Sequence, residues 1–289
     1  MTSPPPAITL RQVLDTLDLE QVNAEFFVGN QIDEIAHHIS GGHIAAQALM
    51  AASRTVTDRL PHSMHMYFLR PGDARHPVDF EVTALHDGGT FSARRVTARQ
   101  FGSALLEGVV SFSKAVESIV YQQLPPDLPE PESVPTFAEQ HSDHADERDG
   151  WWVREQPIDY RYVDPSARLA ADLSGSPASL RMWWRPNGVA PADPIIASCL
   201  VAFVAGRTLL ESAMIPRGTT PLGPGFSALM DLAVWFHHSP DLSDWLLYEQ
   251  HSPSGIGGRG LSQGTMFNRT GQLVCTMTLE CYFGGKSRS

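Results

Sequence analysis

The segment GGHIAAQALMAASRTV, residues 41–56, decides the fold because it predicts a helix that is apolar on nearly every side. Its alanines favour a helix, Ile44, Ala48 and Ala51 recur at helical spacing, and two glycines mark its start. Strands are predicted after it from alternating apolar and polar residues, at 62–68, 77–84, 90–100 and 103–113. The first unit is therefore one buried helix followed by an antiparallel meander.

The same order of elements returns in the second half of the chain. PIIASCLVAFVAGRTLLESAM, residues 194–214, predicts a second apolar helix. Further strands are predicted at 181–188, 226–238, 244–252, 258–268 and 273–283. The dipeptides Phe101-Gly102 and Thr270-Gly271 indicate hairpin turns in corresponding places. We predict an α+β fold of two tandem repeats, in which each long helix lies on its own antiparallel sheet.

A connector separates the two predicted repeats. LPPDLPEPESVP at 124–135 holds five prolines and is followed by a charged run, a composition typical of links and exposed excursions. We therefore divide the chain into an N-terminal repeat at 1–120, a connector at 121–160 and a C-terminal repeat at 161–289. The charged run contains residue types that bind metals, namely His141, Asp143, His144, Asp146 and Glu147. Their spacing fits no tight site, so we predict no metal.

Composition and charge narrow the classes of partner. The chain has 289 residues, is 42% hydrophobic and carries a formal net charge of −11. This acidic balance argues against nucleic acid or an anionic membrane as the main partner. The N-terminus lacks a signal-peptide pattern, and the uncharged apolar run at 194–206 is shorter than the ~20 residues of a membrane helix. Cys199, Cys275 and Cys281 form no CxxC motif. We therefore expect buried reduced thiols and a cytoplasmic protein.

Seven segments carry a family resemblance, and they occur in one order from about residue 10 to 283. They are GGHIAAQAL (41–49), HSMHMYFLRPGD (62–73), DGGTFSARRVTARQFG (87–102), PIDYRYVDP (157–165), DPIIASCLVAF (193–203), WFHHSPDLSDWLLY (235–248) and GRGLSQGTMFNRTGQLV (258–274). Together they resemble the type II acyl-CoA thioesterases. The resemblance implies a double hotdog fold, in which two curved antiparallel sheets each wrap a long helix. It also implies fatty acyl-CoA as the ligand, no cofactor, and assembly into a homo-oligomer.

Hydrolysis of acyl-CoA to fatty acid and CoA in this family depends on an acid near the second helix, a Ser or Thr on the next strand, and a Gln on the last strand. The matching positions here are Gly206, Leu229 and Leu279. None can activate a water, so we expect them to be non-catalytic and hydrolysis to be weak or absent. Restoring the polar set is expected to raise the rate. The alternative is a catalytically silent acyl-CoA-binding protein, or an assembly or regulatory subunit.

Four other residues are candidates for a substitute base, and each also has a structural interpretation. His43 is expected to cap or pack at the helix start, Asp231 and His237 to belong to a strand motif, and Glu211 to face outward.

Arginines are the candidates for the phosphates of CoA, because guanidinium groups match phosphate oxygens. Arg94 and Arg95 are named first, with Arg70 and Arg259 beside them. Neighbouring strand residues point to opposite faces, so at least one of Arg94 and Arg95 is expected in a structural ion pair. The tryptophan pairs 151–152 and 183–184 are interpreted as packing or subunit contacts, and not as a stacking platform for adenine.

Overall fold

The two predicted apolar helices form the centre of the molecule. The structure, a computed structural model, describes residues 7–32, 37–173, 176–221, 223 and 225–284. Helix α2 (Gly41–Ser53) begins after Ser40, whose hydroxyl accepts a hydrogen bond from the His43 N–H. Helix α5 (Pro194–Thr208) begins after Asp193, whose carboxylate accepts from two backbone N–H groups. Of the 13 residues of α2, 12 are buried, as are 11 of the 15 residues of α5, because alanine and branched aliphatic side chains cover most of their faces.

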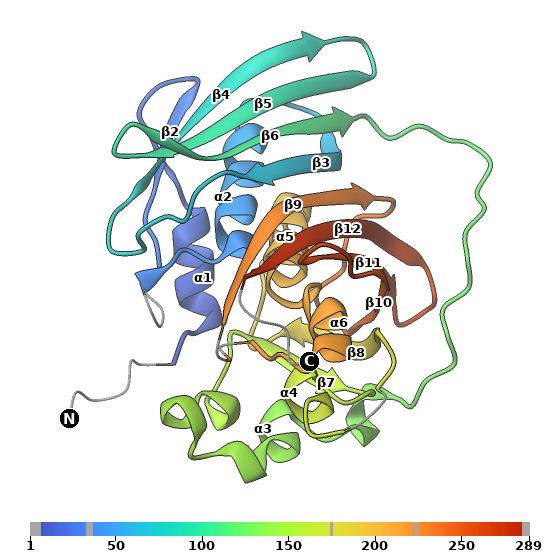
Figure 1. The fold of residues 1–289 in the computed structure, drawn as a ribbon. Helices are drawn as coiled ribbons and strands as arrows, with labels where there is room; N and C mark the ends of the chain where they lie inside the picture. The colour runs from blue at the N-terminus through green and yellow to red at the C-terminus, as the bar shows by residue number, and fades with distance from the viewer. Residues whose placement is uncertain (1–6, 33–36, 174–175, 222, 224, 285–289) are drawn as a thin grey trace.

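The described strands join one antiparallel sheet, which curves around these helices (Figure 1). Its strands are β1 (Glu20–Gln21), β2 (Phe26–Gly29), β3 (Leu60–Phe68), β4 (Val78–Asp87), β5 (Phe91–Gln100), β6 (Ser103–Ser113), β7 (Ile158–Tyr162), β8 (Ser179–Pro186), β9 (Phe226–Phe236), β10 (Leu246–Ser254), β11 (Arg259–Asn268) and β12 (Leu273–Gly284). Their order is β1-β2-β4-β5-β6-β3-β9-β12-β11-β10-β8-β7. Counted inward from each edge, the two halves of the sheet have the same arrangement: β1-β2-β4-β5-β6-β3 in one half corresponds to β7-β8-β10-β11-β12-β9 in the other. Strands β3 and β9 pair at the centre. This symmetry confirms the predicted pair of helix-and-sheet repeats.

The predicted strands are present with ends shifted by a few residues, and both hairpins are found. Phe101 and Gly102 have φ angles of 51° and 77°, the left-handed values that a two-residue hairpin turn requires. Gly271 has a φ of 84° at the turn between β11 and β12. The short strands β1, β2 and β7 were not predicted. β1 and β2 have too few residues to show a clear alternation, whereas β7 alternates between buried and half-buried residues and was missed. The three cysteines are free and buried, as expected.

Shorter helices complete the described chain. They are α1 (Leu10–Leu17), η2 (Pro131–Ser133), α3 (Phe137–Gln140), η3 (Ser142–His144), η4 (Glu147–Val153), α4 (Ala167–Ala170), α6 (Glu211–Met214) and η5 (Ile215–Arg217). The predicted second helix is therefore divided, since α5 ends at Thr208 and α6 begins at Glu211. Together, α5, α6 and η5 make a run, Pro194–Arg217, that is long and apolar enough to cross a membrane. The most apolar window of this run is 83% buried inside the protein, so its side chains already form the core.

Candidate functional site

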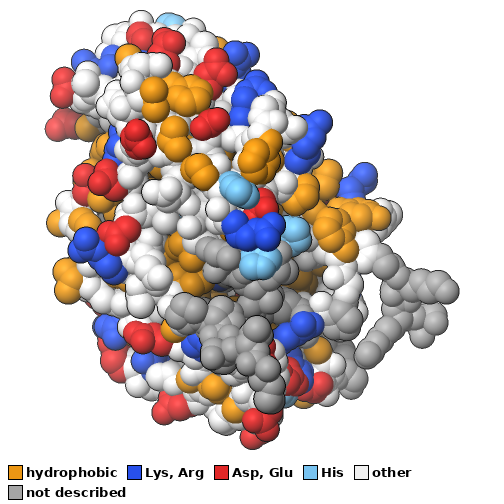
Figure 2. All heavy atoms as spheres, turned by 90° about the vertical axis from the view of Figure 1, so that its left-hand side faces the viewer, with side chains coloured by type: hydrophobic (Ala, Val, Ile, Leu, Met, Phe, Trp, Pro, Cys, Tyr) orange, Lys and Arg blue, Asp and Glu red, His pale blue; other side chains and the backbone are white. Residues whose placement is uncertain are grey.

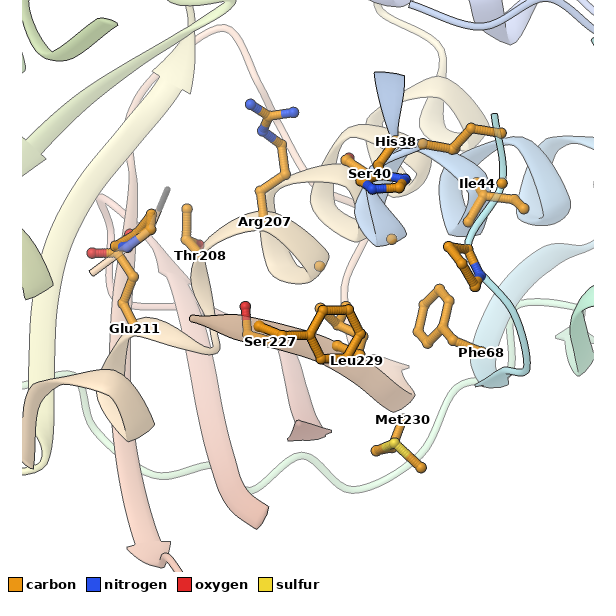
Figure 3. A pocket seen from close by; sticks show the side chains of 18 of the residues that line it. His38, Ser40, Ile44, Phe68, Arg207, Thr208, Glu211, Ser227, Leu229 and Met230 are labelled. Carbon is orange, nitrogen blue, oxygen red and sulfur yellow. The ribbon is translucent and has the colours of Figure 1, made fainter. Parts of the chain in front are cut away.

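A cavity of about 600 Å³ lies where the two repeats meet. Its wall comes from the start of α2, the loop after β3, the end of α5, the first half of β9 and residues between 151 and 162. Phe68 and Ile44 lie toward one end of the view in Figure 3 and Glu211 toward the other, with Leu229 between them. An apolar hollow with a few polar groups is typical of a small-molecule site.

Two of the three positions matched to catalytic residues, Gly206 and Leu229, line this cavity. A Cβ atom on Gly206 would lie 2.5 Å from the Cα atom and 2.6 Å from the N atom of Gly42. A Cβ atom on Gly41 would lie 2.7 Å from Leu229 Cδ2. The first turn of α2 therefore fills the space beside positions 206 and 229. An aspartate at 206 would require α2 and α5 to move apart, so restoring the polar set is not a simple exchange of side chains.

The third position, Leu279, lies in the core of the sheet. It is fully buried on β12, opposite Leu232 of β9, and is not among the residues that line the cavity. Cys275, Met277 and Cys281 are buried on the same face of β12, as the alternation predicted. The structure thus brings Gly206 and Leu229 together and places Leu279 among apolar neighbours.

Of the four substitute bases, three lie away from the cavity lining. His43 packs at the start of α2, as predicted, with its Nε2 atom 2.8 Å from Thr16 Oγ1. The Asp231 carboxylate accepts a 3.0 Å hydrogen bond from the Glu280 N–H across the sheet. His237 lies beyond the end of β9 and is exposed. None of the three is positioned to act on a ligand in this cavity.

Glu211 is different, and the prediction that it faces outward is wrong. It lines the cavity and is only 5% exposed, because the short helix α6 packs its own face against β8, β10 and β11. Its Oε1 atom accepts a 2.8 Å hydrogen bond from the Tyr162 hydroxyl, and its Oε2 atom a 3.2 Å bond from the Ala167 N–H. Burial raises the pKa of the Glu211 carboxyl to about 7. A buried carboxyl that gains and loses a proton near neutral pH is a feature of functional sites.

Of the candidate phosphate-binding arginines, some line the cavity and others do not. Arg94 and Arg95 lie on opposite faces of β5, as predicted; Arg94 is buried with its Nη2 atom 2.9 Å from Asp87, and Arg95 is exposed. Neither lines the cavity, whereas Arg70 and Arg207 do. Arg70 is among the arginines predicted from the sequence, whereas Arg207 was not predicted in this role.

The charged run in the connector has structural partners in the fold. His141 is fully buried, and its Nε2 atom is 2.8 Å from Ser166 Oγ. The Arg168 guanidinium donates to the Glu147 carboxylate at 2.7 Å and approaches His144 Nδ1 at 3.0 Å. These contacts hold η3, η4 and α4 together.

Trp152 was interpreted as packing, but it also lines the cavity. Its side chain is 3% exposed, and its Nε1 atom has no hydrogen-bond acceptor within the described part of the chain. The tryptophan pair lies within the predicted connector, and nothing in that stretch of sequence indicates a place in a cavity wall.

Comparison with known proteins assigns the family. A model for acyl-CoA thioesterase matches residues 153–282, and a model for the acyl-CoA thioesterase N-terminal domain matches residues 30–113. The chain is 31% identical over 282 residues to acyl-CoA thioesterase 2 of Haemophilus influenzae, covering 94% of this chain and 96% of that protein. It is 30% identical over 287 residues to mouse acyl-coenzyme A thioesterase 8, covering 94% and 89% of the two chains.

Solved structures agree with this assignment. A tesB protein of Mycobacterium avium subsp. paratuberculosis matches with a TM-score of 0.81 and 46% identity over 96% of this chain and all of that one. Acyl-CoA thioesterase II TesB2 of Mycobacterium marinum matches with a TM-score of 0.77 and 33% identity over 95% and 99% of the two chains. A hot dog fold protein of Alicyclobacillus acidocaldarius, 20% identical, shows the same fold at a TM-score of 0.77. The predicted double hotdog is confirmed, and the chain belongs to the type II acyl-CoA thioesterase family.

Proposed function

We propose that this chain binds fatty acyl-CoA in the cavity and hydrolyses the thioester at or near the uncatalysed rate. The observation that carries the proposal is the chemistry of Gly206, Leu229 and Leu279, which offer no side-chain base, hydroxyl or amide. Loss of one positioned acid or base typically costs a factor of about 10²–10⁴ in rate. The close contact between Gly206 and Gly42 supports it further, because the fold has no room there for a carboxylate.

The proposed ligand fits the distribution of polar and apolar groups. Arg70 and Arg207 on the cavity wall would pair with phosphate oxygens of CoA, and the exposed Arg95 stays a proposed outer contact. The Arg94 guanidinium is already bonded to Asp87. The apolar wall suits an acyl chain, since each buried methylene contributes about 0.8 kcal/mol.

The distribution of charge on the surface of the protein supports a small molecule as the ligand. On the face in Figure 2, Lys and Arg side chains of the described residues are scattered among acidic and apolar ones instead of forming one basic stripe. With a net charge of −11, this supports a small ligand in place of nucleic acid or an anionic membrane. A cytoplasmic role in fatty acid metabolism is part of the proposal.

The test combines binding and turnover on the same ligands. Calorimetry with thioether analogues of acyl-CoA, which cannot be hydrolysed, should show saturable binding that is tighter than binding of free CoA. Release of free thiol from the corresponding thioesters, followed with a thiol-reactive dye, should not exceed the rate in buffer. Turnover well above that rate, abolished by Glu211→Gln, would refute the proposal and establish Glu211 as a replacement base.

A second candidate, an assembly or regulatory subunit, is favoured by residues 114–124, the segment between β6 and the proline-rich stretch. After β6 the chain runs outside the body of the protein (Figure 1). This segment holds five large apolar residues that are 69–89% exposed, namely Val116, Ile119, Val120, Tyr121 and Leu124. Such a segment is expected to be covered in an assembly, and we propose a homo-oligomer. Light scattering on the wild type and on Ile119→Ser with Tyr121→Ser tests this; a monomer in both cases would contradict it.

A further inference from the structure

One end of the cavity is lined by aromatic side chains that come from the predicted connector and from β7. These side chains, which we call the aromatic end, are Phe137, Trp151, Trp152, Tyr160 and Tyr162. Trp151 is half-buried, and each of the others is at most 9% exposed. The Tyr162 hydroxyl donates a hydrogen bond to Glu211, so the aromatic end lies on the side of the cavity where Figure 3 shows Glu211. Ile44 and Phe68 lie at the opposite side of that view.

The five rings form one cluster around Phe137. The centroid of the Phe137 ring lies 6.0 Å from that of Trp151, 6.1 Å from Trp152, 6.4 Å from Tyr160 and 5.9 Å from Tyr162. The planes of Phe137 and Trp151 are at 89°, and those of Trp151 and Trp152 are at 90° with their centroids 4.8 Å apart. These are the distances and angles of edge-to-face aromatic pairs. Because every member also lines the cavity, a ring bound at this end can join the cluster with the same geometry.

The aromatic end suits the acyl group and excludes the phosphates of CoA. Its rings are almost all buried, and Glu211, 5% exposed, would bring a carboxylate against any phosphate that entered. Burying a phosphate beside a carboxylate is costly. Elsewhere the lining is open to water, since Leu69 and Arg70 are exposed, and the Arg207 side chain extends away from Leu229 in Figure 3. A phosphate bound at Arg70 or Arg207 therefore stays outside the aromatic end, which is left for the acyl group.

An aromatic acyl group gains more from this end than an alkyl chain does. Both bury apolar surface, but only a ring adds edge-to-face contacts with the rings already present. A rigid ring also loses less conformational freedom on binding than a chain of rotatable methylenes. We propose that the cavity selects acyl thioesters of CoA whose acyl chain ends in an aromatic ring, and that the aromatic end holds this ring. This inference rests on the proposed acyl-CoA binding.

The experiment compares ligands that differ only in whether a terminal ring is aromatic. The probes are the thioether analogues of phenylhexanoyl-CoA and cyclohexylhexanoyl-CoA, a shorter pair with butanoyl chains, and free CoA. Calorimetry on the full-length protein gives each Kd. Trp151→Leu and Phe137→Leu each remove one ring of the aromatic end. Trp235→Leu and Phe91→Leu are the matched controls, because these residues lie on β9 and β5 outside the cavity lining. Thermal melting establishes that each variant is folded.

We expect the wild type to bind the phenyl probe about threefold to tenfold more tightly than the cyclohexyl probe in at least one pair. A cavity that is only apolar would bind the cyclohexyl probe at least as tightly, because the saturated ring has the larger apolar surface. Trp151→Leu and Phe137→Leu should each reduce the preference to about twofold or less. Trp235→Leu and Phe91→Leu should retain it. The wild-type comparison needs no variant, so it tests the inference even if Phe137→Leu does not fold.

Each contrary result has a distinct meaning. Binding of both probes of each pair with no preference for the phenyl ring would refute the inference and leave acyl-CoA binding intact. A preference that survives in both Trp151→Leu and Phe137→Leu would also refute it. If Trp151→Leu weakens the binding of free CoA as much as that of the phenyl probes, the aromatic end holds the adenine ring, and the inference is wrong. Absence of binding by every probe would refute the proposed function and the inference together.

Discussion

The contact between α2 and α5 predicts a large effect from a single methyl group. In Gly206→Ala, the new Cβ atom would lie 2.5 Å from Gly42 Cα, whereas carbon atoms in contact prefer about 3.5–4.0 Å. The obstacle is backbone, so relief requires the two helices to separate by roughly 1 Å. Overpacking of this kind costs about 1–3 kcal/mol, offset by about 0.5–1 kcal/mol from the better helix propensity of alanine.

We therefore expect Gly206→Ala to lower the free energy of unfolding by about 1–2 kcal/mol. In a chain of this size that corresponds to roughly 2–8 °C in Tm. Gly206→Asp should cost more, because it also buries an unpaired carboxylate. Urea unfolding and thermal melting would measure both.

Two glycines provide graded controls. A Cβ atom on Gly89 meets nothing within 4 Å, so Gly89→Ala should stay within about 0.5 kcal/mol of the wild type. A Cβ atom on Gly41 meets the end of the Leu229 side chain, which can rotate away, so Gly41→Ala should be intermediate. If Gly206→Ala proves as stable as Gly89→Ala, the close helix contact and the argument against a carboxylate at 206 are both refuted.

Two further predictions follow from buried charged groups. Burial raises the folded-state pKa of Glu211 from its ordinary 4.5 to about 7, so this group stabilises the fold fully below about pH 4.5 and loses that contribution as pH rises to about 7, a change of about 3 kcal/mol. Glu211→Gln should remove this part of the pH dependence; identical slopes of stability between pH 5 and 8 in both proteins would contradict the assignment. Arg94→Met should lower the free energy of unfolding by about 1–3 kcal/mol, because it leaves backbone carbonyls and Thr55 without their donor, whereas Arg95→Met should change it by less than about 0.5 kcal/mol. Equal losses of unfolding free energy in the two variants would refute the larger contribution assigned to the contacts of Arg94.

The sequence by itself determined the repeated architecture and the family. Apolar side chains on all faces of 41–56 and 194–214 require burial, and period-2 alternation in the intervening segments requires strands with one covered face. These patterns are local, so they can be recognised without knowing which elements pack against one another. The absence of polar side chains at positions 206, 229 and 279 was also predicted from the sequence, because it depends only on residue type and order.

Only the tertiary structure decided where the functional groups lie. Glu211 was expected in water, since an acid is seldom buried without a partner, but its partner Tyr162 is on β7, in a distant part of the chain. Gly206 looked like the simple absence of a side chain until α2 was placed against it. Arg94 and Arg95 are indistinguishable as neighbours in sequence, and the face of β5 that meets Asp87 separated them. In each case the deciding contact joins residues on different elements, and a one-dimensional pattern does not encode which elements approach or which side faces the other.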